Sequence, residues 1–151
     1  MPYRWCCKSS CTRIKSIFNK IHMIENFGLG IDIVNTDKFE KMPYSKKPTF
    51  YKKLFLPSEI KYYLRFKKSG EHFAGKFAIK ESLKKSIIKP ISFLDIETYH
   101  SNSKLKIKLL KGWSKKYKVL GSISHDKKYA IGMLSLKKSI CNYYYFISII
   151  N

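Results

Sequence analysis

Acidic residues are scarce in this sequence. Its 151 residues include 10 Asp and Glu against 31 Lys and Arg, which gives a formal net charge of +21 at pH 7. Cysteine is rarer still, and its residues lie only near the two ends of the chain, at positions 6, 7, 11 and 141. A disulfide-stabilised domain distributes its cysteines through the fold. The pattern therefore excludes a disulfide framework and favours a reducing compartment.

Glycine and proline are few, with 7 and 5 residues, whereas 44% of the residues are hydrophobic. This composition excludes a disordered, collagen-like or low-complexity chain. Long hydrophobic runs are also missing, since the best candidate, at 141–150, is shorter than the ~18 residues that a membrane-spanning helix requires. We therefore expect one globular domain without a membrane span, as the chain length also suggests.

The excess of cations indicates an anionic partner. The chain from residue 23 onward keeps 26 of the 31 cations and all 10 acids, so it carries +16. Such a surface attracts nucleic acid, anionic lipid, phosphorylated small molecules or an acidic protein. Composition alone leaves these alternatives open.

The chain divides into three segments. Residues 1–22 are basic and acid-free, which is typical of an organelle presequence, but a dispensable extension ahead of a start at Met23 explains them equally well. Residues 23–138 hold the expected domain, and the apolar tail at 139–151 has no assigned structure. We expect a cytoplasmic protein, or an organelle-matrix protein if the first segment is a presequence.

The hydrophobic patterns predict a mixture of helices and antiparallel strands. Strands are expected at 29–34, 93–99, 104–110, 119–124 and 128–136, and helices are expected from Pro57 to Leu64 and at about 71–87. A break is expected at Ser69–Gly70, and a hairpin turn at 125–127. Because strands and helices do not alternate regularly, we predict an α+β fold, a single domain with a mainly antiparallel sheet packed with a long helix.

Two acids stand out among the cations. Asp32 lies inside an apolar strand, where an unpaired carboxylate is costly to bury. Glu81 lies in the long helix, with Lys85 on the same face and Lys80 and Lys84 beside it. One interpretation is a solvated Glu81–Lys85 salt bridge, worth about 0.3–0.5 kcal/mol. The other is that Asp32 and Glu81 share Mg²⁺ and the lysines neutralise phosphates, as in a phosphoryl-transfer site.

Three segments resemble motifs of the holo-[acyl-carrier-protein] synthases, which are small single-domain 4'-phosphopantetheinyl transferases. They are GLGIDIV at 28–34, FAGKFAIKES at 73–82 and SISHDKKYA at 122–130, in the order and at the distances seen in that family. The segment FLDIE at 93–97 also resembles a family strand. The resemblance covers residues 23–137.

The resemblance implies a Mg²⁺-dependent transfer of phosphopantetheine from coenzyme A to a serine of an acidic apo acyl carrier protein, in support of fatty acid biosynthesis. It implies Asp32 and Glu81 as metal ligands, with Glu81 and Lys80 assigned to catalysis. It also implies a homotrimer with active sites between subunits. The residues that it assigns to coenzyme A are Lys76, Lys85, Ser124 and His125.

Some points differ from the family pattern or remain open. The family usually has Arg where this chain has Lys76, which keeps the charge but loses the bidentate fork for phosphate. Either Glu81 or a metal-bound water molecule is a candidate proton acceptor.

Two alternatives without catalysis are a small basic nucleic-acid-binding protein and a carrier-protein docking module. The aromatic residues concentrate in helices and the tail, without an RNA-binding motif, so we expect no nucleic-acid partner.

Overall fold

The computed structural model describes residues 26–126 and 128–139. The expected extension at 1–22 and nearly all of the apolar tail therefore lie outside the described residues. The helices are α2 (Asp37–Lys41), α3 (Pro48–Leu54), α4 (Pro57–Tyr63), α5 (Ser69–Ser86) and α6 (Trp113–Lys116), with a 3₁₀ turn, η1, at Phe93–Asp95. The strands are β1 (Phe27–Asn35), β2 (Ile96–Ser101), β3 (Lys104–Leu109), β4 (Tyr117–Asp126) and β5 (Tyr129–Lys138).

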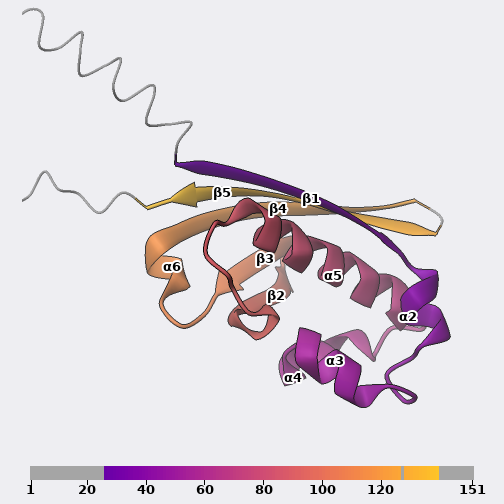
Figure 1. Ribbon diagram of the computed structural model, residues 1–151. Coiled ribbons are helices and arrows are strands. Elements are labelled where there is room, and N and C mark those ends of the chain that lie inside the picture. Colours follow the sequence, from indigo (N-terminus) through magenta and orange to yellow (C-terminus); the bar gives the residue numbers. More distant parts are fainter. Residues whose placement is uncertain (1–25, 127, 140–151) are drawn as a thin grey trace, which may run out of the picture.

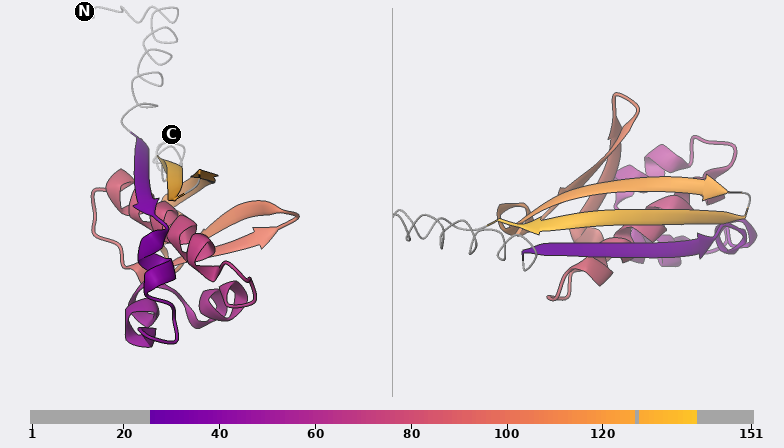
Figure 2. Two further views of the ribbon diagram at one scale, coloured as in Figure 1. Left: turned by 90° about the vertical axis from the view of Figure 1, so that its right-hand side faces the viewer. Right: turned by 90° about the horizontal axis from the view of Figure 1, so that it is seen from above.

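Two antiparallel sheets and one long helix form the framework. Strands β1, β5 and β4 make a three-stranded sheet in that order, and β2 and β3 make a separate hairpin. Helix α5 lies against one face of the larger sheet, and the other described helices lie on the same side of it (Figure 1). Seen from above, β5 runs between its two neighbours along their length (Figure 2). The predicted α+β class is confirmed.

Glycines allow α5 to approach the sheet at backbone distance. A Cβ atom on Gly30 of β1 would overlap the carbonyl oxygen of Ser82, and one on Gly132 of β5 would overlap the α5 backbone at Ala78 and Ile79. Ser82 then donates a hydrogen bond of 2.7 Å to the carbonyl of Gly132. The glycine-rich start of β1 is thus the surface on which α5 packs.

The core has an aromatic and an aliphatic half. Buried rings of α3, α4 and α5 pack together around Tyr51, Phe55, Tyr63 and Phe73. The second half of α5 packs aliphatic side chains against the larger sheet and the β2–β3 hairpin. Within the described residues, no helix is both long and apolar enough to cross a membrane.

The structure corrects three local predictions. Ser69 and Gly70 are the first residues of α5 rather than a break ahead of it, and the missing side chain of Gly70 lets this first turn lie against Glu40 of α2. Strand β2 starts at Ile96 rather than at residue 93, because the side chain of Ser92 caps η1. His125 and Asp126 belong to β4 rather than to the turn, where they pair with β5.

The large apolar residues of β1 point away from the core. Leu29 is 63% exposed and Ile33 is 61% exposed, whereas the glycines and Asp32 face α5. The alternation of the strand is as predicted, with Asp32 opposite the larger side chains. The face of the sheet remote from α5 is apolar, and we call it the open sheet face. Its exposed members are Phe27, Leu29, Ile31, Ile33, Leu120, Tyr129, Ile131 and Met133.

Candidate active site

Asp32 and Glu81, far apart in the sequence, line one cavity. Asp32 comes from β1 and Glu81 from α5, and they share a cavity of about 430 Å³ whose other walls come from β1, α2, α5 and the start of α3. Their side chains are 16% and 27% exposed. The close packing of α5 on β1 is what places the two carboxylates together. We call this space the Asp32–Glu81 cavity.

Lys85 of α5 binds to β1 beside this cavity. Its ammonium group lies 2.6 Å from Oδ1 of Asp32 and also donates to the carbonyl of Ile31, at 3.3 Å. Glu81 instead has Lys84 at 3.9 Å. The Glu81–Lys85 salt bridge that the helical spacing suggested is therefore not formed.

The donor set suits a magnesium ion. Mg²⁺ takes one or two protein carboxylates and completes its octahedron with water and phosphate oxygens. Asp32 and Glu81 supply two carboxylates at an open cavity, and the described residues contain no cluster of three or more metal-binding side chains. A cation held here would share Asp32 with Lys85.

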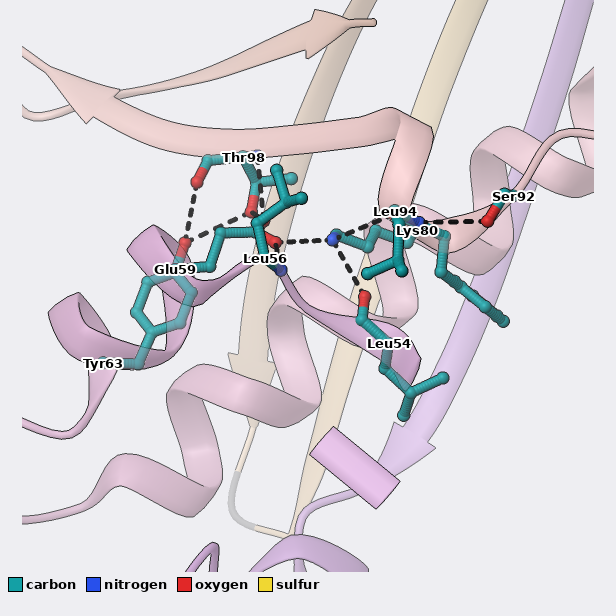
Figure 3. A network of polar contacts seen from close by, with 9 residues as sticks. Leu54, Leu56, Glu59, Tyr63, Lys80, Ser92, Leu94 and Thr98 are labelled. Carbon is teal, nitrogen blue, oxygen red and sulfur yellow. Dashed lines mark hydrogen bonds and ion pairs between the residues drawn. The ribbon is translucent and has the colours of Figure 1, made fainter. Parts of the chain in front are cut away.

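Lys80, which the resemblance assigns to catalysis, does not line this cavity. Its side chain is 0% exposed and its ammonium group lies 2.7 Å from Oε2 of Glu59 (Figure 3). It also donates to the carbonyls of Leu54 and Phe93, at 3.0 and 3.2 Å. Burial lowers the pKa of Lys80, and the paired carboxylate opposes that effect. Lys80 is thus a core residue on the turn of α5 that carries Glu81.

Glu59 completes this buried network. Its other carboxylate oxygen accepts hydrogen bonds from the backbone and the hydroxyl of Thr98 on β2. The hydroxyl of Tyr63 donates to the carbonyl of Thr98 at 3.0 Å, and burial raises the pKa of Tyr63. The network ties α4, α5 and β2 into one unit.

A second cavity, of about 570 Å³, contains two of the residues assigned to coenzyme A, Lys76 and His125. We call it the Lys76 cavity. Lys76 is 2% exposed, and burial lowers its pKa to about 8. His125 contacts the carbonyl oxygen of Glu71 at 3.3 Å, in space left by Gly75. The remaining lining residues are His72, His100, Ser103, Lys104, Leu105, Lys106, Leu120, Gly121, Ser122 and Ile123.

The assigned residues thus divide between two places. Asp32 and Glu81 line the first cavity, and Lys85 binds Asp32 beside it. Ser124 is exposed on β4 and lines neither cavity. His72 and His100 were not identified from the sequence. The spacing of His72 and Lys76, one helical turn apart, is a signal that could have found the first. His100 reaches the cavity only through the fold of the β2–β3 hairpin.

Comparison with known proteins decides the family. The model of the 4'-phosphopantetheinyl transferase superfamily matches residues 28–134. The chain belongs to this superfamily. A holo-[acyl-carrier-protein] synthase of Geobacter sp. is 32% identical over 74% of this chain and 98% of its own length. Another from Mycoplasma capricolum is 37% identical over 74% of this chain and 93% of its own length.

A solved structure also resembles this phosphopantetheinyl transferase. The holo-(acyl-carrier-protein) synthase of Bacillus anthracis, in complex with coenzyme A (3',5'-ADP), is 29% identical with a TM-score of 0.63. The likeness covers 74% of this chain and 96% of that one. The resemblance drawn from the three motifs is confirmed, as is the expectation of an enzyme, and the two alternatives without catalysis are not supported.

Proposed function

We propose that this protein transfers 4'-phosphopantetheine from coenzyme A to a serine of apo acyl carrier protein, in a Mg²⁺-dependent reaction that releases adenosine 3',5'-bisphosphate. The observation that carries the proposal is that Asp32 and Glu81 line one cavity, with Lys85 bound to Asp32, in a chain of this superfamily. Holo acyl carrier protein is the expected product, and fatty acid biosynthesis is the process that we expect it to serve.

The reaction forms one bond and breaks one. The serine oxygen attacks the β-phosphorus of the coenzyme A pyrophosphate, and the bond from that phosphorus to the bridging oxygen breaks. The leaving group is a phosphate monoester, and the serine proton passes to Glu81 or to a water molecule. Such transfers depend on positioning and on neutralising charge.

The two carboxylates of the Asp32–Glu81 cavity and the two lysines that support them have separate parts in this reaction. Asp32 and Glu81 would hold Mg²⁺, which supplies positive charge to the pyrophosphate oxygens. Lys85 orients Asp32 and adds a second positive charge beside the phosphates. Lys80 acts as a positioning residue, because its buried pair with Glu59 fixes the helical turn that presents Glu81.

An acidic carrier protein also fits the charge of the surface. Exposed lysines surround α3, α4 and the turn that leads to α5, and they would steer a negatively charged partner at a rate that falls with added salt. The lysines that we assign to this role are Lys46, Lys47, Lys52, Lys53, Lys61, Lys67 and Lys68.

We propose that the protein works as a cytoplasmic homotrimer with its sites between subunits. The support is the open sheet face, which exposes more large apolar side chains than a monomer usually leaves to water. Asp32 lies on β1, the strand that contributes four of these side chains. Subunits that meet at this face would place the Asp32–Glu81 cavity near a subunit boundary.

The test is a transfer assay read by intact mass. The protein is incubated with apo acyl carrier protein, coenzyme A and Mg²⁺, and the carrier is expected to gain one phosphopantetheine arm. Asp32→Asn and Glu81→Gln should each lose transfer while keeping a wild-type thermal transition. Glu97→Gln, a change on β2 outside the cavity, is the matched control. Wild-type turnover in either cavity variant would show that the metal assignment is wrong.

A further inference from the structure

The Lys76 cavity places a buried ammonium group beside an imidazole and an aromatic ring. Nζ of Lys76 lies 3.3 Å from Nε2 of His100 and 5.7 Å from the centroid of the Tyr63 ring. Among the described residues, no carboxylate oxygen lies within 4.0 Å of this nitrogen. A buried charge without a counter-ion is costly. The cavity therefore favours an anionic ligand that supplies the missing charge.

The charged groups that the structure describes around Lys76 leave its ammonium group without a direct counter-ion. The one carboxylate that influences it from the core, Glu59, is bound to Lys80. The titratable and charged groups that face Lys76 and His100 are Glu59, Tyr62 and Tyr63 from α4, Glu71 and His72 from α5, Lys104 and Lys106 from β3, and His125 from β4.

We propose that a phosphate group bound in the Lys76 cavity is held through proton uptake, so that the ligand binds more tightly as the pH falls through the weakly alkaline range. The inference rests on the proposed function, in which the phosphate belongs to coenzyme A or to adenosine 3',5'-bisphosphate. It is particular to this chain, because an arginine at position 76 would stay charged across that range.

The direction of the pH dependence follows from the protonation state of Lys76 before and after the ligand binds. Burial lowers its pKa to about 8 in the free protein, and a phosphate in contact favours the charged form and raises that pKa again. Burial is also the main cause that lowers the pKa of His72 and of His100, and neighbouring cationic groups lower both values further. A bound anion would oppose this lowering as well. Binding therefore takes up protons, and by linkage affinity rises as pH falls.

The part of the pH dependence that Lys76 causes can be separated from the part caused by ionisation of the phosphate. A phosphate monoester has its second pKa near about 6, so above about pH 7.5 its charge is constant. In the free protein Lys76 is about half protonated at pH 8 and about one-tenth protonated at pH 9. We therefore expect affinity for adenosine 3',5'-bisphosphate to fall roughly fivefold between these two values of pH.

The experiment is isothermal titration calorimetry of the full chain with adenosine 3',5'-bisphosphate, in two buffers of different ionisation enthalpy. At pH 8 the wild-type protein should take up about half a proton per ligand. Lys76→Arg should bind without that uptake and lose the pH dependence, because arginine is protonated throughout. Lys115→Arg, an exposed change on α6, should keep the wild-type uptake.

A second variant keeps the test decisive if arginine disturbs the buried site. Lys76→Met should bind more weakly than wild type at pH 7 and approach the wild-type affinity at pH 9. Equal proton uptake in wild type and Lys76→Arg, with binding and phosphopantetheine transfer intact, would overturn the inference and leave the proposed function standing. If neither coenzyme A nor the bisphosphate binds and no transfer occurs, the proposed function fails and the inference fails with it.

Discussion

Lys80 and Glu59 form a fully buried ion pair whose remaining hydrogen bonds are made with backbone groups and with the hydroxyl of Thr98. The ammonium group is held by one carboxylate and two carbonyls, and the carboxylate also accepts from Leu56 and Thr98. Removing one partner of such a pair leaves an uncompensated charge in a medium of low dielectric constant. The pair thus has consequences for stability that an exposed pair does not have.

At the scale of single residues we predict that Lys80→Met lowers the free energy of unfolding by about 3–5 kcal/mol. The double variant Lys80→Met, Glu59→Gln should recover part of that loss, because the buried carboxylate is then neutral. Urea unfolding followed by circular dichroism measures both. Lys68→Met, which removes an exposed partner of Glu71, is the control and should change stability by less than about 1 kcal/mol. A small effect for Lys80→Met would contradict the role assigned to the pair.

The contact between α5 and β1 decides whether the two carboxylates can act together. Asp32 and Glu81 lie on different elements, and only the glycine side of β1 lets the helix backbone come this close. Gly30 faces Ser82, the residue after Glu81, so a side chain there would push the helix away at the site itself.

At the scale of elements we predict that Gly30→Ala weakens transfer at least tenfold and destabilises the fold by about 1–3 kcal/mol. The added methyl group meets backbone, which cannot move aside, so α5 and β1 must separate. Gly121→Ala is the matched control for stability, because its methyl group would meet only the ends of the Ile79 and Ile107 side chains. Thermal unfolding compares the two variants, and the transfer assay is read for Gly30→Ala against the wild type, since Gly121 lines the Lys76 cavity. Equal losses of stability in the two variants, or wild-type transfer by Gly30→Ala, would argue against helix approach as the reason for the glycine.

The whole molecule has one covered and one open sheet face. The open sheet face is broad and apolar, with Ile31 opposite Met133 and Ile33 opposite Ile131 across the β1–β5 pair. Ile88 is also exposed, but it lies on the loop after α5 and belongs to no strand of this sheet.

At the scale of the assembly we predict that Ile31→Lys converts a trimer into monomers and lowers transfer. Size-exclusion chromatography with light scattering gives the mass directly. Ile88→Lys introduces the same charge at an exposed isoleucine of the loop, and it should leave the mass unchanged. A monomeric wild-type protein with full activity would contradict the trimer.

The sequence by itself determined the fold class and the family. Alternation placed Asp32 opposite the apolar residues of β1, and helical spacing put Glu81 and Lys85 on one face of α5. These inferences succeeded because both periods follow from local backbone geometry, which a sequence pattern expresses directly. The three motifs identified the family because their order and spacing along the chain can be read directly from the sequence.

Tertiary structure decided which polar groups meet. Lys80 and Lys85 look equivalent beside Glu81 in the sequence, yet the fold buries the first against Glu59 and turns the second toward Asp32. His100 joins Lys76 in one cavity although 24 positions separate them. Whether a charge is buried, and what it faces there, depends on packing between distant elements, and no local period of the sequence carries that information.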